Sequence, residues 1–164
     1  MKKTLTGTPR ELAQVLFLLK QDKEYEIKEY IPLRGTQANR YFHKLVNELA
    51  KYNRASGYAI SNEEMKIKMN LAYGTLATTE NGEVIEIIIP KGTDLTSVYN
   101  YVELHRSSEK YDYYLVYKNT HELNSKEFYQ LIKGVEQECR DVGIKTLDDI
   151  EFEKMMEEYE KDIK

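Results

Sequence analysis

Hydrophobic side chains recur at helical spacing over residues 36–54 and form one continuous stripe. Its members follow the i, i+3, i+4, i+7 pattern of an amphipathic helix: Ala38, Tyr41, Phe42, Leu45, Val46, Leu49 and Tyr52. The positions on the opposite side are Arg40, Lys44, Asn47, Lys51 and Arg54, and we call these five residues the basic ridge. No acidic residue stands in line with them. The pattern predicts a long helix with one buried face and one basic face.

A capping pattern predicts a second helix directly after the first. Ser61 is followed three residues later by Glu64, the spacing at which a side chain and a backbone N–H cap each other reciprocally. The helix is expected to run to about Tyr73. It adds Lys66 and Lys68 to the basic residues of this part of the chain.

The last third of the chain is predicted to be helical. Asn124 and Glu127 repeat the capping pattern, and Gly143 ends the helix that they open. Residues 147–164 then form a second, very acidic helix with a narrow apolar seam. The seam consists of Phe152, Met155, Met156 and Tyr159. We expect it to pack on its own domain rather than on a partner.

The middle of the chain is rich in β-forming residues. Asn81-Gly82 lies between two such runs, which is a strong signal for a β-hairpin. Residues 84–89 are almost all apolar and are expected to form a strand covered on both faces. Residues 98–105 and the tyrosine-rich run 111–117 are the other predicted strands.

These elements predict an α+β fold in which a small central antiparallel or mixed sheet is packed by several helices and followed by a C-terminal helical segment. We expect residues 1–164 to form a single domain. Its front, residues 1–74, is basic and helical, with a short helix after Pro9 and one strand at 25–31. The β-rich middle covers residues 75–120, and the C-terminal helices cover residues 121–164.

Charge is distributed unevenly along the 164 residues, although the formal net charge is only -4. Residues 1–54 carry about 11 Lys and Arg against about 6 Asp and Glu, whereas residues 121–164 carry about 7 against about 13. The modest net charge therefore does not exclude a polyanionic partner. No stretch approaches the about 18 consecutive apolar residues of a membrane span, and a single cysteine allows no intramolecular disulfide, so a cytoplasmic setting is expected.

No phosphate-binding loop, nucleophile elbow or zinc-ligand spacing occurs, so we expect neither catalysis nor a cofactor. Cys139 lies on the apolar stripe of its predicted helix and reads as a buried, inert thiol. The carboxylates that could assemble a magnesium site are Asp94, Glu103 and Asp112, near the ends of the β-segments. They leave open the alternative of a small magnesium-dependent phage nuclease.

Tyrosine is unusually frequent, with 14 residues. Aromatic rings beside a basic surface are what single-stranded nucleic acids require, because cations follow the phosphates while rings stack on unpaired bases. Tyr41 and Tyr52 belong to the apolar stripe and are expected to be buried. Tyr30, Tyr58 and Tyr73 are the tyrosines expected to be free for stacking.

Three short motifs resemble the NinB/Orf family of phage recombination proteins, in the version found in phages of Gram-positive hosts. They are Leu33-Arg34-Gly35-Thr36-Gln37-Ala38-Asn39-Arg40-Tyr41-Phe42-His43, Ser61-Asn62-Glu63-Glu64-Met65-Lys66, and Leu123-Asn124-Ser125-Lys126-Glu127-Phe128 with Gly143-Ile144-Lys145-Thr146-Leu147. The motifs span most of the chain in the order of the family. The chain departs from the family in lacking tryptophan, with Tyr41 and Phe42 standing where the family often has it.

The resemblance implies a non-catalytic homodimer that acts in the cytoplasm of a bacterial host. Such a protein binds single-stranded DNA and helps to load a recombinase or annealing protein, so a recombinase or single-strand-binding protein is an expected partner. The candidate DNA-binding residues are Arg34, Asn39, Arg40, His43, Lys44, Lys51, Arg54, Lys66 and Lys68. A third possibility is a protein-interaction module that acts through the acidic C-terminal helix.

Overall fold

The structure is a computed structural model that describes Ala13 and residues 36–163. Contacts divide the chain into two units, residues 1–33 and 34–164, and every helix and strand described below belongs to the second. The strand expected at 25–31 lies outside the described residues, and so does the short helix expected after Pro9 apart from Ala13.

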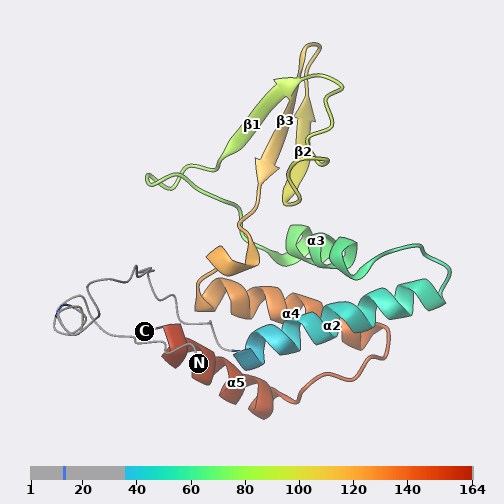
Figure 1. The fold of residues 1–164 in the computed structure, drawn as a ribbon, viewed down its shortest axis with the longest axis vertical. Coiled ribbons are helices and arrows are strands. Elements are labelled where there is room, and N and C mark those ends of the chain that lie inside the picture. Colours follow the sequence, from blue (N-terminus) through green and yellow to red (C-terminus); the bar gives the residue numbers. More distant parts are fainter. Residues whose placement is uncertain (1–12, 14–35, 164) are drawn as a thin grey trace, which may run out of the picture. The chain divides into compact units, whose positions relative to one another are not determined.

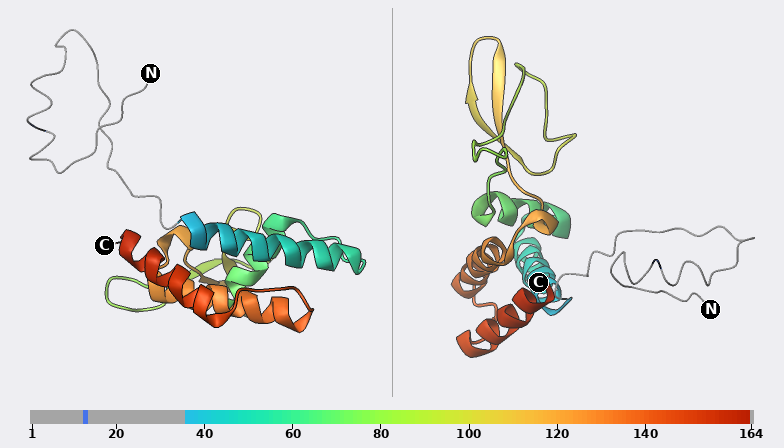
Figure 2. Two further views of the ribbon diagram at one scale, coloured as in Figure 1. Left: turned by 90° about the horizontal axis from the view of Figure 1, so that it is seen from below. Right: turned by 90° about the vertical axis from the view of Figure 1, so that its left-hand side faces the viewer.

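Among the described residues, four helices form one body: α2 (Thr36–Ala55), α3 (Asn62–Tyr73), α4 (Ser125–Asp141) and α5 (Asp149–Ile163). All four were predicted from the sequence, with ends within a few residues of those observed. Helices α2 and α4 pack against each other and against both α3 and α5. Figures 1 and 2 show them side by side between α3 and α5.

The predicted capping residues begin two of these helices. Ser61 accepts a hydrogen bond from the Glu64 N–H at 3.1 Å, and the Glu64 carboxylate accepts one from the Ser61 N–H at 2.7 Å. Asn124 and Glu127 exchange the same pair of bonds at the start of α4. Each exchange satisfies backbone N–H groups that a helix start leaves without partners.

The apolar faces of the four helices meet in one core. Its largest fully buried side chains include Phe42, Phe128, Phe152 and Tyr159. The Phe42 and Phe128 rings meet edge to face with centroids 5.7 Å apart, which is a favourable aromatic geometry. The seam of α5 therefore packs within its own domain, as the sequence predicted.

In the part of the chain that the structure describes, this core holds one carboxylate, that of Glu136 on α4, whose side chain is 1% exposed. Tyr41 on α2 donates its hydroxyl to Glu136 Oε1 at 2.6 Å and accepts the Leu147 N–H at 2.9 Å. Lys133 and Arg140 lie 3.4 and 3.6 Å from Glu136 Oε2 and also reach Asp149 at the start of α5. A buried charge is tolerated only when paired, and this network ties α2, α4 and α5 together.

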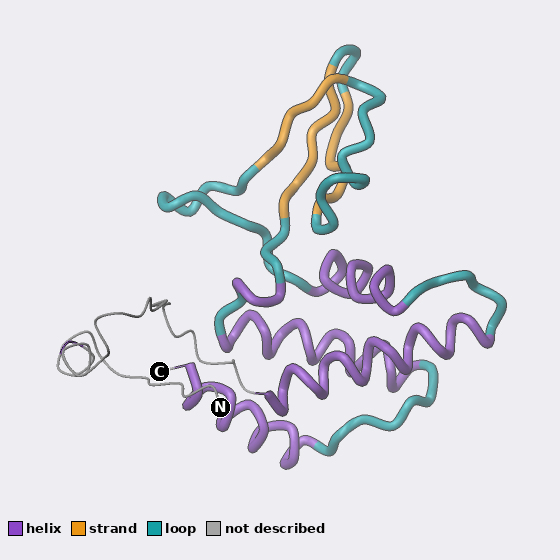
Figure 3. Tube along the Cα trace, in the orientation of Figure 1, coloured by secondary structure: helices purple, strands orange, loops and turns teal. Residues whose placement is uncertain are grey.

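The strands form a three-stranded antiparallel sheet in the order β1 (Glu86–Pro90), β3 (Tyr111–Val116), β2 (Val102–Ser107) (Figure 3). One face carries a small cluster of its own around Leu95, Val102 and Tyr114. This cluster shares no residue with the core of the helices. This antiparallel sheet and the four helices together confirm the α+β class predicted from the sequence.

The predicted turn at Asn81-Gly82 is present, with Gly82 at φ +82°, a left-handed conformation that favours glycine. The Thr79 N–H donates to the Glu83 carbonyl at 2.8 Å across it. The expectation that residues 84–89 are covered on both faces was wrong. Ile88 is 56% and Val84 47% exposed, because the second face of this sheet is open to solvent.

Candidate nucleic-acid interface

Helix α2 exposes all five residues of the basic ridge along the side opposite its buried stripe. Arg40 and Lys51 are separated by 11 residues, or about 16 Å along the helix axis. The ridge is therefore long enough to meet several groups of an extended ligand. Tyr52, expected in the buried stripe, is instead 43% exposed.

Most cations of the ridge have no counter-ion. Within the described residues, Arg40, Lys44 and Lys51 take part in no ion pair. Glu48 is exposed on the flank of the ridge, four residues after Lys44, but forms no ion pair with it. These three cations are available to an anionic ligand at no cost in internal contacts.

Arg54 has a structural task at the end of the ridge. Its guanidinium donates to the Ile60 carbonyl at 2.8 Å and to Asn62 Oδ1 at 3.1 Å. These bonds hold the loop between α2 and α3 against the last turn of α2. Arg54 thus contributes charge to the ridge while its direction is fixed by the protein.

His43 and Lys66 lie close together where α3 crosses α2. Partial burial holds the pKa of His43 below its ordinary value, and the positive charge of Lys66 lowers the pKa further. Lys68 is two residues beyond Lys66, about 200° around the helix, so it points to the other flank of α3. The predicted set therefore divides, with Lys66 beside His43 and Lys68 directed elsewhere.

Two other predicted residues add little to the site. Asn39 is half-buried and already engaged in an interaction of its own. Arg34 lies outside the described residues.

The carboxylates of the nuclease alternative do not assemble. Asp112 accepts the Ser107 hydroxyl at 2.5 Å and the Gly92 N–H at 3.1 Å, and these bonds lower its pKa. Glu103 pairs with Leu115, three residues along β3 from Asp112, so the two carboxylates lie on opposite faces of the sheet. Asp94 caps its own turn by accepting from Thr96. No cluster of metal-ligating side chains occurs in the part of the chain that the structure describes.

The cysteine and the remaining histidines form no site either. Cys139 is fully buried, as predicted, and burial raises the pKa of its thiol to about 12. His105 lies at an irregularity of β2 and His121 in a short 3-10 turn, Thr120–Glu122. Both are exposed and on different elements from His43.

The tyrosines predicted to be free differ from one another. Tyr58 is 67% exposed in the loop after α2. Tyr73 is half-buried and donates its hydroxyl to Glu138 at 2.5 Å, a bond that raises the pKa of Tyr73 to about 12. Tyr30 lies outside the described residues. Tyr52 was missed because its position at the edge of the apolar stripe suggested burial.

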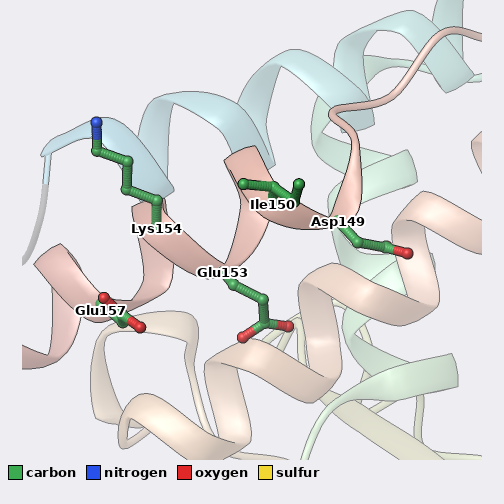
Figure 4. Close-up of a pocket in the computed structure, with 5 residues that line it drawn as sticks. All are labelled: Asp149, Ile150, Glu153, Lys154 and Glu157. Carbon is green, nitrogen blue, oxygen red and sulfur yellow. The ribbon is translucent and has the colours of Figure 1, made fainter.

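Figure 4 shows a surface pocket on α5, lined by Asp149, Ile150, Glu153, Lys154 and Glu157. All five belong to one helix, and the charged ends of the four ionisable side chains point in different directions. A site for a small ligand needs polar groups that converge from several elements. This pocket offers no such convergence.

No protein-family model matches the chain, and comparisons with curated proteins and with solved structures find no match either. Among the described residues, no helix has the length and apolar character needed to cross a membrane.

Proposed function

We propose that the protein binds single-stranded DNA through the basic ridge of α2 and acts as a phage recombination mediator. The observation that carries the binding proposal is that Arg40, Lys44 and Lys51 are exposed, aligned and without counter-ions among the described residues. Cations arranged in this way suit the phosphates of an extended strand, whose counterions they displace. The recombination role is supported by the motif resemblance to the NinB/Orf family.

The charge of the ridge sets the expected salt dependence of binding. Each phosphate neutralised on a single strand contributes a slope of about -0.7 to log affinity against log salt concentration. Three such contacts give a slope of about -2. Binding is then weak and salt-sensitive, as expected for a protein whose formal net charge is -4.

The test is a salt titration with a labelled oligothymidylate and a labelled duplex, followed by fluorescence anisotropy in the presence of magnesium. The variant Arg40→Glu/Lys44→Glu/Lys51→Glu should lose binding and retain the wild-type circular dichroism spectrum. A matched control reverses three exposed lysines elsewhere: Lys126→Glu/Lys145→Glu/Lys154→Glu. This control changes the net charge by the same amount as the ridge variant and should keep most of the affinity for the oligothymidylate.

The same assay separates the alternatives. Wild-type affinity in the ridge variant would refute the assignment of the ridge. Cleavage of the labelled DNA that depends on magnesium would favour a nuclease instead. The homodimer and the recombinase or single-strand-binding partner also belong to this proposal, and light scattering measures the dimer directly.

A further inference from the structure

Three tyrosines of the helical body have their hydroxyls tied to carboxylates. Tyr41 donates to Glu136 at 2.6 Å, Tyr73 to Glu138 at 2.5 Å, and Tyr129 to Glu153 at 2.6 Å. Tyr159 is buried in the core, with 2% of its surface exposed. Tyr52 and Tyr58 differ from all of these. They are 43% and 67% exposed, and both lie at the C-terminal end of the basic ridge.

The loop that carries Tyr58 is held in place by the end of α2. Gly57 adopts φ +94°, a left-handed conformation that turns the chain back. The Tyr58 N–H then donates to the Asn53 carbonyl at 3.0 Å, and the Ser56 N–H donates to the Tyr52 carbonyl at 3.0 Å. Together with the bonds from Arg54 to Ile60 and Asn62, these contacts fix the backbone of Tyr58 against the last turn of the helix.

Exposing two large rings on a constrained backbone favours binding. A ring that stays exposed contributes little to the free energy of folding. A ring whose backbone is already ordered loses less conformational entropy when a ligand covers it. Lys51 directly precedes Tyr52, about 100° around the helix, and supplies positive charge at this end of α2. The combination of cations and free rings matches a nucleic-acid strand whose bases are unpaired.

We propose that Tyr52 and Tyr58 stack on unpaired bases of a single strand whose phosphates contact Arg40, Lys44 and Lys51, and that they make binding specific for single strands. This inference rests on the proposed function of the ridge. Bases of a duplex are already stacked on one another, so the rings gain nothing from them. The ridge then supplies charge attraction to either form, and the two tyrosines supply the preference for single strands.

The first experiment measures affinity for single-stranded and duplex DNA over a range of salt concentrations, using Tyr52→Ala, Tyr58→Ala and the double variant. Loss of base stacking should weaken single-strand binding about 5- to 150-fold for each tyrosine. Duplex affinity and the salt slope should not change, since no phosphate contact is lost. Tyr52→Phe and Tyr58→Phe retain the ring and should bind as wild type does.

A matched control is Tyr99→Ala in the loop before β2, because Tyr99 is 52% exposed and remote in sequence from the ridge. This variant should keep wild-type affinity. Unchanged single-strand affinity in the double variant would overturn the inference, as would an equal loss for duplex and single strand. If the wild-type protein binds neither DNA, the proposed function itself fails, and the two failures are therefore distinguishable.

The second experiment uses the absence of tryptophan from the chain. Tyr58→Trp introduces a single tryptophan, whose fluorescence should be quenched on saturation with an oligothymidylate. An abasic oligonucleotide offers the same phosphates without bases and should bind without quenching. Equal quenching by both strands, or by neither, would contradict stacking. Tyr99→Trp should report no change with either strand.

Discussion

Helices α2 and α5 bury their apolar faces in the same core but present opposite charges to solvent. Helix α2 carries four basic residues and one acidic residue, whereas α5 carries seven acidic and two basic residues. Several acids of α5 are engaged within the protein: Asp149 pairs with Lys133 and Arg140, and Glu153 accepts the Tyr129 hydroxyl. The cations of α2, apart from Arg54, have no such partners among the described residues. Charge on α5 thus fixes a helix, while charge on α2 remains available to a ligand.

The largest expected effect is on the free energy of unfolding, and it shows whether α2 and α5 are packed equally well in the core. Phe152 of α5 is fully buried, its ring lies 3.9 Å from the Lys133 ammonium, and it also packs against Tyr41 and Tyr129. Phe152→Ala should lower the free energy of unfolding by about 3–5 kcal/mol in urea titrations. Phe42→Ala in α2 is the matched variant and should cost a similar amount. A loss below about 1 kcal/mol for Phe152→Ala would mean that α5 is a detachable tail.

The second prediction concerns the hydrogen bonds that join α2 to the part of the core next to α5. Tyr41→Phe deletes the hydroxyl that donates to the buried Glu136 and accepts from Leu147. Because the partner is a buried carboxylate, the free energy of unfolding should fall by about 2 kcal/mol. Tyr129→Phe removes a similar bond on an exposed pair and should cost much less. Equal losses in the two variants, measured by thermal unfolding, would contradict the role assigned to burial.

A smaller effect concerns the start of α5. Asp148 Oδ1 accepts the Glu151 N–H at 2.8 Å, an N-terminal cap, and the acidic residues that follow suit the positive end of the helix dipole. Asp148→Ala should destabilise the protein by about 1 kcal/mol in urea titrations. Asp148→Ser keeps an acceptor and should recover most of the loss. Helix α2 has no acid in its first turn, so its charge is not arranged for capping.

The smallest effect is the pH dependence of His43 beside the ridge. Its pKa is depressed in the free protein, and a bound phosphate would raise it again. Binding should therefore take up a proton, and affinity should rise a few-fold as pH falls below about 6.5. The free energy of unfolding changes in the opposite direction. Protonation of His43 opposes folding, because the pKa of His43 is lower in the folded protein than in the unfolded chain, so stability falls as the pH falls over the same range. His43→Gln should remove both effects, and His121→Gln neither, in anisotropy and unfolding titrations at several pH values.

Local rules in the sequence predicted much of this structure. The capping pairs Ser61 with Glu64 and Asn124 with Glu127 act within three residues, so their bonds depend little on the rest of the fold. The basic ridge could be predicted as well, because helical periodicity alone determines which residues lie opposite a buried stripe. The exposed cations of the candidate site could therefore be predicted before the structure was known.

Features that depend on residues distant in the sequence could not be predicted in this way. Tyr52 has the spacing of a core residue, but Leu49 and Ala50 are the last residues of α2 that the core buries. Ile88 lies in a continuous apolar run, a pattern that favours a strand covered on both faces, and only the arrangement of the other elements leaves one face of this strand open to solvent. The separation of Glu103 from Asp112 follows from the register of β2 on β3, which spacing along the chain does not reveal.

The burial of Cys139 has a practical consequence for chemical labelling. Its Sγ lies 3.8 Å from the Leu45 carbonyl inside the core, and no other thiol exists in the chain. A cysteine introduced on the surface, at position 58 for example, would be the one thiol of the folded protein that reacts readily with a maleimide. Spin labels or fluorophores can thus be attached at chosen sites without first replacing the native cysteine.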